Sequence, residues 1–165
     1  MLIPVEVVGV RIEMPSNQPI VLLKEVEGSR FLPIWVGAVE ATSIAFAQQG
    51  LTAERPLTHD LISNLLDHTD ITLTAVHITE LRDGIFFAQM LLRRDGVAME
   101  HLSARPSDAI AIALRAKANI LVDSDLLDSA GIDIPEQQQE SASEDGQLEA
   151  FREFLDQINP EDFAG

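Results

Sequence analysis

The chain has 165 residues, a formal net charge of −16 and no cysteine, so disulfides, zinc–thiolate sites and thiol nucleophiles are excluded. Hydrophobic residues make up 46% of the chain and aromatic residues only 5%, which requires an aliphatic core. Residues 1–135 hold 10 basic and 18 acidic side chains, and residues 136–165 hold 1 and 9, so each part carries −8. Proteins that bind nucleic acid usually present a basic surface. Any contact with nucleic acid must therefore use a local cluster of arginines or bridging metal ions.

The apolar runs and the N-terminal sequence bear on where the protein is found. No apolar run approaches the roughly 20 residues of a membrane span. The N-terminal sequence Met1-Leu2-Ile3-Pro4 has neither the basic region nor the cleavage site of a signal peptide. We therefore expect a cytoplasmic protein without membrane contact.

The first half of the chain predicts strands followed by helices. Runs of β-branched and aliphatic residues predict strands at residues 5–13, 20–26 and 31–36. The spacing of apolar residues then becomes helical, which predicts a helix over residues 38–49 with Gly50 as its C-terminal cap. A second helix is predicted over residues 58–68.

The second half predicts a meander of strands and a buried helix. Strands are predicted at residues 71–81, 85–92 and 97–102. The turns are Asp83-Gly84 and Asp95-Gly96, because Asp-Gly favours tight hairpins. Residues 106–117 predict a helix that is apolar all round, and a short strand at 120–122 and a helical turn at 124–129 follow. We expect an α+β fold in which helices pack against a curved, mixed and largely antiparallel sheet.

The chain divides into three parts. We expect one domain over residues 1–135, a polar acidic linker over residues 136–146, and an amphipathic, acidic helix and tail over residues 147–165. Apolar residues recur at helical spacing in the last part, at Leu148, Phe151, Phe154, Leu155 and Ile158. This stripe must be buried against the domain itself, a neighbouring subunit or a protein partner.

Two arginine–proline motifs begin the helices predicted at 58–68 and 106–117. They are Arg55-Pro56-Leu57-Thr58-His59-Asp60 and Arg105-Pro106-Ser107-Asp108. Backbone chemistry alone explains both, since Thr58 and Ser107 are good N-caps and the helix dipole favours an acid in the first turn. A functional interpretation is also open, because a helix N-terminus beside a guanidinium binds phosphate. The candidate phosphate-binding residues are then Arg55, Thr58, Arg105 and Ser107. The two arginines could equally bond carboxylates within the fold.

Three carboxylates and one histidine complete the candidate site. Asp60, Asp108 and Glu40 could hold Mg²⁺ or Mn²⁺. His59 could act as a general acid or base, or it could be an exposed residue of the first helical turn. Glu40 is also a favourable first-turn acid, and Trp35 is either a base-stacking platform or part of the strand packing. No organic cofactor is indicated, because phosphate-loop and dinucleotide glycine motifs are absent.

Four segments together carry a resemblance to a known family. They are Leu32-Pro33-Ile34-Trp35-Val36-Gly37 with Glu40-Ala41, Arg55-Pro56-Leu57-Thr58-His59-Asp60-Leu61, Phe86-Phe87-Ala88, and Arg105-Pro106-Ser107-Asp108-Ala109-Ile110-Ala111-Ile112-Ala113-Leu114-Arg115. In these residues, and over roughly residues 3–135, the chain resembles the bifunctional nuclease domain family. It looks like a bacterial member with an acidic C-terminal extension.

The resemblance implies an α+β fold, a homodimer or larger homo-oligomer, and nuclease activity on DNA and RNA. The candidate site residues that it carries over are Glu40, Arg55, His59, Asp60, Arg105 and Asp108. One departure concerns the residue two positions before Arg105, where family members often have an acid and this chain has Ser103. If that acid were a metal ligand, this chain would lack one.

Two functions of different classes fit the sequence. The first is a nuclease that hydrolyses phosphodiester bonds with metal assistance, in which carboxylates hold the metal, arginines position the phosphate and His59 moves a proton. The alternative is a non-catalytic regulatory or interaction module, which dimerises and docks a partner through the C-terminal helix. The acidic net charge, Ser103 and the apolar stripe motivate this alternative. Binding of a small anionic ligand at the two helix starts is a third hypothesis.

Overall fold

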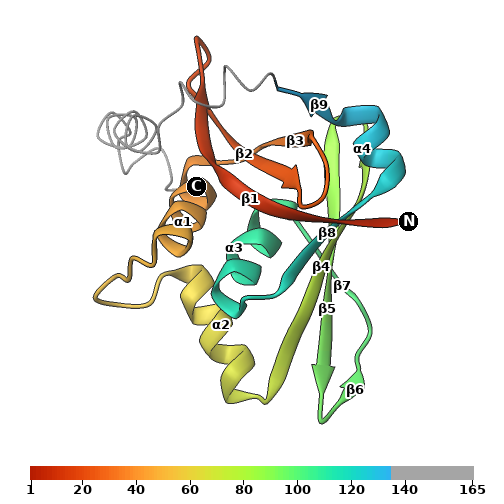
Figure 1. The fold of residues 1–165 in the computed structure, drawn as a ribbon. Coiled ribbons are helices and arrows are strands. Elements are labelled where there is room, and N and C mark those ends of the chain that lie inside the picture. The colour runs from red at the N-terminus through yellow and green to blue at the C-terminus, as the bar shows by residue number, and fades with distance from the viewer. Residues whose placement is uncertain (135–165) are drawn as a thin grey trace.

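The structure is a computed structural model that describes residues 1–134 of the chain. The linker and the amphipathic helix predicted over residues 136–165 lie outside the described residues. Residues 1–134 form one α+β unit in which helices pack against a curved sheet, as the sequence predicts (Figure 1).

A mixed sheet forms the centre of the fold. The strands described are β1 (Leu2–Glu13), β2 (Gln18–Glu25), β3 (Arg30–Trp35), β4 (Ile71–Arg82), β5 (Ile85–Arg94), β6 (Val97–Ala98), β7 (Leu102–Ala104), β8 (Asn119–Asp123) and β9 (Ile132–Asp133). Their order is β6-β5-β4-β8-β1-β2-β3-β9, and β7 also pairs with β5. Among the described pairings only that of β4 with β8 is parallel, which makes the sheet largely antiparallel, as predicted.

Tight hairpins join β4 to β5 and β5 to β6 at the predicted Asp-Gly turns. Asp83, Gly84, Asp95 and Gly96 all have φ between 51° and 77°. Positive φ at both central residues is the geometry of a type I′ turn, whose twist matches that of the flanking strands. The two hairpins therefore follow directly from the local sequence.

The prediction of a single strand over residues 97–102 is wrong, because the structure has two short strands there, β6 and β7. β6 pairs with Arg93 and Arg94, whereas β7 pairs farther along β5. Between them the Met99 amide still bonds the Leu92 carbonyl at 2.9 Å, and the Met99 side chain packs partly buried against the core. The pairing is interrupted after Met99, where Glu100 and His101 lie opposite the single residue Leu91 of β5. Strand β9 was not predicted, since two residues carry no periodic signal.

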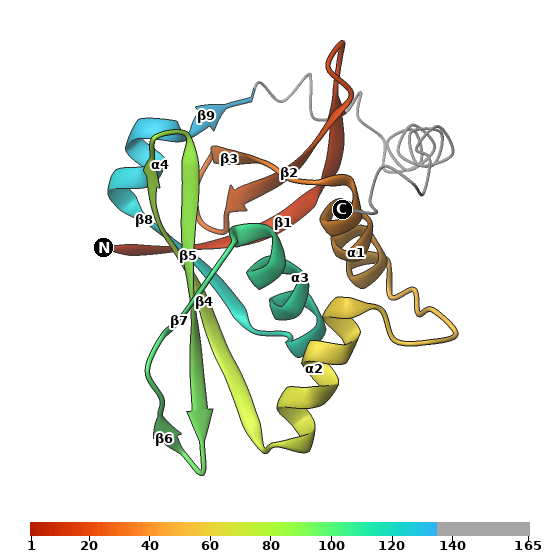
Figure 2. The same cartoon turned by 180° about the vertical axis from the view of Figure 1, so that it is seen from behind.

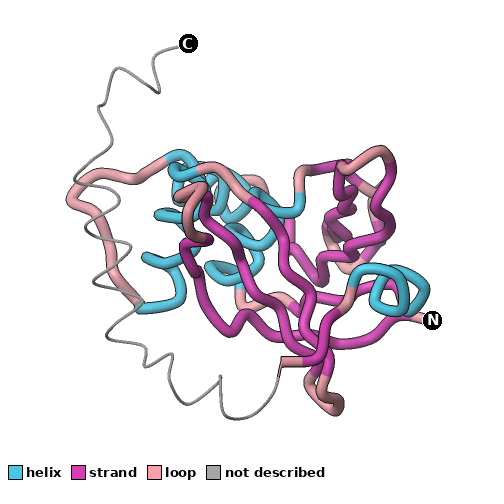
Figure 3. Tube along the Cα trace, turned by 90° about the horizontal axis from the view of Figure 1, so that it is seen from above, coloured by secondary structure: helices cyan, strands magenta, loops and turns pink. Residues whose placement is uncertain are grey.

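The helices are α1 (Ala38–Gln49), α2 (Thr58–His68), α3 (Pro106–Ala116) and α4 (Ser124–Ala130). The bounds of α1 and α2 are those predicted, and Gly50 caps α1 with a φ of 67°. α1, α2 and α3 gather on one side of the sheet, seen from opposite sides in Figures 1 and 2 and from above in Figure 3. α4 begins beside the N-terminus, where the Ser124 amide bonds the Met1 carbonyl at 2.8 Å. No helix within residues 1–134 is long and apolar enough to cross a bilayer.

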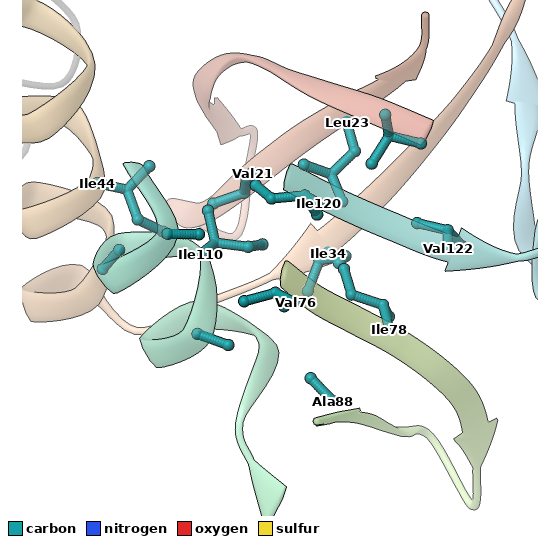
Figure 4. Close-up of a cluster of buried hydrophobic side chains, with 14 of the residues drawn as sticks. Val21, Leu23, Ile34, Ile44, Val76, Ile78, Ala88, Ile110, Ile120 and Val122 are labelled. Atoms are coloured by element: carbon teal, nitrogen blue, oxygen red, sulfur yellow. The ribbon is translucent and has the colours of Figure 1, made fainter. Parts of the chain in front are cut away.

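Helix α3 is the most deeply buried of these helices, as its all-round apolar sequence predicts. Ala109, Ile110, Ala111 and Ala113 are fully inaccessible to solvent. The small alanines allow the helix backbone to approach its neighbours closely. Figure 4 shows Ile110 among side chains of α1, β2 and β4, which include Ile44, Val21 and Val76. The position of α3 therefore determines where its charged first and last turns emerge.

We expect Ile110→Ala to lower the free energy of unfolding by about 2–5 kcal/mol, because it removes buried methyl groups and leaves a cavity. Urea titration followed by circular dichroism measures this change. Leu61→Ala is the control, because that side chain on α2 is 61% exposed and its truncation should cost within about 0.5 kcal/mol. Equal effects of the two substitutions would contradict the central place of α3 in the core.

Candidate functional site

The first turns of three helices supply the predicted site residues. Glu40 lies in the first turn of α1, His59 and Asp60 in that of α2, and Asp108 in that of α3. Arg105 is the N-cap residue of α3. The packing of α1 and α2 against α3 therefore brings together groups that lie far apart in the sequence.

Four of these side chains form one continuous network. The Arg105 guanidinium donates through Nε to Asp108 Oδ2 at 2.8 Å and through Nη2 to Glu40 Oε1 at 3.0 Å. The other oxygen of Asp108, Oδ1, lies 2.8 Å from His59 Nε2. We call Glu40, Arg105, Asp108 and His59 the four-residue network. It connects α1, α2 and α3 through polar contacts, as predicted for a site but also as expected for a structural clamp.

The four-residue network runs from the protein interior to the solvent. The His59 side chain is 6% exposed, Glu40 17%, Asp108 28% and Arg105 66%. A guanidinium has five N–H groups. Arg105 donates two of them to the carboxylates, so the others remain available on its exposed side. Arg105 is therefore the member best placed to meet a ligand.

Electrostatics hold the centre of the network in its ionised form. Burial alone would raise the pKa of Asp108, but the hydrogen bonds from Arg105 and His59 outweigh burial and place that pKa below its ordinary value of 3.8. The hydrogen bond to Asp108 raises the pKa of Arg105, with a smaller contribution from Glu40. At neutral pH the Asp108 carboxylate and the Arg105 guanidinium are therefore a charged pair.

Asp60 lies in a separate branch, beside His59. Its Oδ1 accepts a 2.6 Å hydrogen bond from Nε of Arg115, and its Oδ2 accepts one of 2.9 Å from the Leu57 amide. The hydrogen bond from Arg115 is the largest cause that lowers the pKa of Asp60. Arg115 was not predicted as a site residue. The sequence feature that could have identified it is an arginine at the end of an otherwise apolar helix, because a buried cation requires a partner.

Arg55 does not join the four-residue network. It is exposed in the loop before α2, and within residues 1–134 no hydrogen bond or ion pair connects it to Arg105, Asp60 or Asp108. The two arginine–proline motifs are therefore not equivalent. In the second motif Arg105 bonds its own Asp108, whereas in the first Asp60 bonds Arg115 of another helix.

The prediction that Thr58 and Ser107 are N-caps is wrong. The N-cap residues are Leu57 and Arg105, and neither side chain caps its helix. In α3 the proline occupies the first helical position, where its missing N–H has no consequence, so the helix begins before Ser107. In α2 the Asp60 carboxylate reaches back to the Leu57 amide and caps the helix from the third position. Thr58 is exposed and Ser107 is 7% exposed.

The predicted carboxylates were compared with the needs of a divalent metal ion. Mg²⁺ and Mn²⁺ require several oxygen ligands that converge on one point. Among residues 1–134 no group of three histidine or acidic side chains is arranged to hold a metal ion. Glu40 and Asp108 bond Arg105 instead, and Asp60 bonds Arg115. These side chains, as placed, do not fit a metal site.

A cavity of about 360 Å³ lies elsewhere in the molecule. It is lined by the start of β1 and the end of β2, at Met1, Leu2, Ile3, Pro4, Glu25, Val26 and Glu27. It shares no residue with the four-residue network. The size of this cavity is therefore no reason to place the functional site there.

The lowered pKa of Asp108 predicts a pH-dependent contribution to stability. Because the folded pKa lies below the unfolded value of 3.8, the ionised carboxylate stabilises the fold above that value, and this contribution is lost as pH falls through the folded pKa. We expect Asp108→Asn to lower the free energy of unfolding by about 1 kcal/mol at pH 7, since a charge-assisted bond becomes neutral. The difference from the wild-type chain should shrink below pH 3.8.

Urea unfolding at pH 7 and at pH 3 tests this pH dependence. Asp95→Asn is the control, because Asp95 is an exposed residue of the β5–β6 turn. A difference between wild-type and Asp108→Asn chains that is the same at both pH values would contradict the ionised pair. The Asp95→Asn difference should be small throughout.

The sequence was then compared with those of known proteins. The model of the bifunctional nuclease domain matches residues 21–135, more than half of the chain. Two uncharacterized proteins of Mycobacterium tuberculosis, from strains CDC 1551 and H37Rv, are each 45% identical over 162 residues, 96% of this chain and 96% of theirs. Their similarity therefore extends into residues 136–165, beyond the family domain.

Plant proteins are more distant relatives. Bifunctional nuclease 1 of Arabidopsis thaliana is 31% identical over 124 residues, and bifunctional nuclease 2 of Oryza sativa subsp. japonica is 29% identical over 127 residues. These matches cover 73% and 75% of this chain but only 38% and 39% of the plant proteins. The family match, the mycobacterial relatives and the α+β fold agree with the resemblance seen in the sequence. The chain belongs to the bifunctional nuclease domain family.

Proposed function

We propose that this chain is a nuclease that hydrolyses phosphodiester bonds of DNA or RNA at the four-residue network. The observation that carries the proposal is Arg105, whose side chain is 66% exposed and whose guanidinium is held by two carboxylates at the N-terminus of α3. Hydrogen bonds on one edge fix its orientation, while its other N–H groups face solvent. Family membership supports nuclease activity, and the geometry supports this location for it.

Arg105 is proposed to bind the scissile phosphate. Arginine forms paired hydrogen bonds to phosphate oxygens, and a helix N-terminus favours an anion. Two acidic side chains surround Arg105 in the network, so a further cation would favour binding of an anionic strand. Arg55, exposed before α2, is proposed to supply this cation by binding a neighbouring phosphate of the same strand.

Glu40 is proposed to accept a proton from the water that attacks phosphorus, while the P–O bond to the leaving sugar oxygen breaks and that oxygen takes up a proton from solvent. Its Oε1 is bonded to Arg105, whereas no hydrogen bond within residues 1–134 occupies Oε2, which lies over Gly37. A carboxylate oxygen beside the phosphate-binding arginine has the position that a general base requires. His59 is buried and its Nε2 is engaged with Asp108. Its proposed part in proton transfer is therefore indirect, through the orientation of Asp108 against Arg105.

Metal assistance by Mg²⁺ or Mn²⁺ was expected from the sequence, but the carboxylates within residues 1–134 do not converge as ligands. Cleavage assays should therefore include three conditions: EDTA, Mg²⁺ and Mn²⁺. Activity that persists in EDTA is expected from the network as placed. Strict metal dependence would require the carboxylates to release their arginines on metal binding.

We expect Arg105→Ala to lower kcat/KM by roughly 10²–10³-fold, because it removes the donor to the phosphate. The assay uses fluorescent single- and double-stranded DNA and RNA. Arg82→Ala is the matched control, since Arg82 is a 60% exposed arginine paired with Glu80 on β4 and should leave kcat/KM unchanged. Thermal unfolding shows that both variants remain folded.

The same assay distinguishes the alternative function. If the wild-type chain cleaves none of these substrates under any metal condition, or if Arg105→Ala retains full activity, the proposal fails. The chain would then be a non-catalytic interaction module. Light scattering of the full chain with and without residues 136–165 would next measure its oligomeric state and the part played by the C-terminal segment.

Gly37 offers a test of Glu40 that leaves its carboxylate chemically intact. A methyl group at Gly37 would overlap Glu40 Oε2, and the flexible side chain must swing away. The Gly37 φ of −72° suits alanine, so the backbone is not strained. We expect Gly37→Ala to lower kcat about as much as Glu40→Gln while the thermal stability changes little. A Gly37→Ala enzyme with wild-type kcat would contradict the role of Glu40.

A further inference from the structure

We propose that Arg115 is a positioning residue of this site, which acts through Asp60 to hold the first turn of α2 so that His59 meets Asp108. The inference rests on the proposed function in so far as this placement serves hydrolysis at the four-residue network. Arg115 itself lies at the far end of α3 and touches no member of that network.

Apolar packing holds α2 only weakly. His59 is its one fully buried residue, and Ile62 and Leu66 are only partly buried. Leu61 and Leu65 are 61% and 59% exposed. A helix that buries so little apolar surface needs other contacts to determine its orientation. The polar contacts of its first turn supply them.

Arg115 joins the backbones of α3 and α2 through Asp60. The Arg115 side chain is 11% exposed, and its Nη1 donates to the Ala111 carbonyl of its own helix at 2.8 Å. Its Nε donates to Asp60 Oδ1 at 2.6 Å. Asp60 Oδ2 in turn accepts from the Leu57 amide at 2.9 Å, at the N-cap of α2. Each end of the connection is thus fixed to main-chain atoms.

Two consecutive residues of α2 therefore bind two separated points of α3. His59 bonds Asp108 and Asp60 bonds Arg115, and these partners lie seven residues apart, or about 10 Å along the helix. A single contact would allow the first turn of α2 to pivot. Two contacts with separate residues of α3 oppose rotation of that turn, so the Asp60–Arg115 pair helps to determine where the His59 ring lies.

The test compares Arg115→Met, Asp60→Asn and the double variant in the full chain. We expect each single variant to lower kcat on the order of 10²-fold with KM little changed, because Arg115 contacts no substrate and a small misplacement is enough. The double variant should be no worse than either single variant, since both break one connection. The signals of the His59 ring nitrogens, assigned with His59→Gln, should shift in ¹⁵N NMR spectra of all three variants.

Arg30→Met is the matched control for a loss of stability. Arg30 is also a partly buried arginine between two acids, Glu25 and Asp128, but it belongs to β3 and lies outside the network. We expect it to lower the melting temperature without moving the His59 signals or kcat. His59 signals that stay unchanged in Arg115→Met would overturn the positioning role. If the wild-type chain proves to have no nuclease activity, the proposed function fails, but the NMR signals still decide whether Arg115 positions His59.

Discussion

The burial of α3 is the constraint on which the rest of the structure depends. Its middle is closely packed and apolar, so its position is determined by the core. Its two ends carry Asp108 and Arg115, which are charged and at least partly buried. Each charge requires a partner, because an unpaired charge in this position would be strongly destabilising. Arg105 pairs with Asp108 and connects it to α1 through Glu40, while the first turn of α2 supplies Asp60 for Arg115 and the His59 ring for the second oxygen of Asp108.

The same contacts fit two purposes, a structural clamp and the proposed site, which is why the motifs allow two interpretations. As a clamp, the network connects three helices that share little other polar contact. As a site, it presents one exposed arginine whose orientation is fixed by hydrogen bonds to two less exposed carboxylates. The two purposes fall on side chains that differ in solvent exposure. Arg105 ends in solvent and contributes little to stability, whereas Asp108 and Arg115 support the fold and the geometry together.

Much of the fold could be predicted from local sequence. The bounds of α1 and α2 follow from helical periodicity and from the punctuation at Gly50 and Pro56, and the hairpins follow from Asp-Gly pairs. β6 and β7 could not be separated in advance, because the break between them is an extra residue in the pairing with β5, which the spacing of apolar residues does not show. The N-caps were misplaced for local reasons, since the proline occupies the first position of α3 and the Asp60 carboxylate accepts a hydrogen bond from the free Leu57 amide of α2.

The candidate site was predictable in its members but not in its pairing. Residue type and motif select Glu40, His59, Arg105 and Asp108, which meet in the four-residue network. They also select Arg55, Thr58, Asp60 and Ser107, which lie outside it. Spacing along the chain cannot say which arginine Asp60 chooses, and the nearby Arg55 is a more obvious partner than Arg115 at a distance of 55 residues. The choice follows from burial: Arg115 emerges from the core and has few alternatives, whereas Arg55 is hydrated and needs no carboxylate. Pairing with Arg115 leaves Arg55 as an uncommitted cation on an acidic domain, which is the property that a phosphate-binding residue requires.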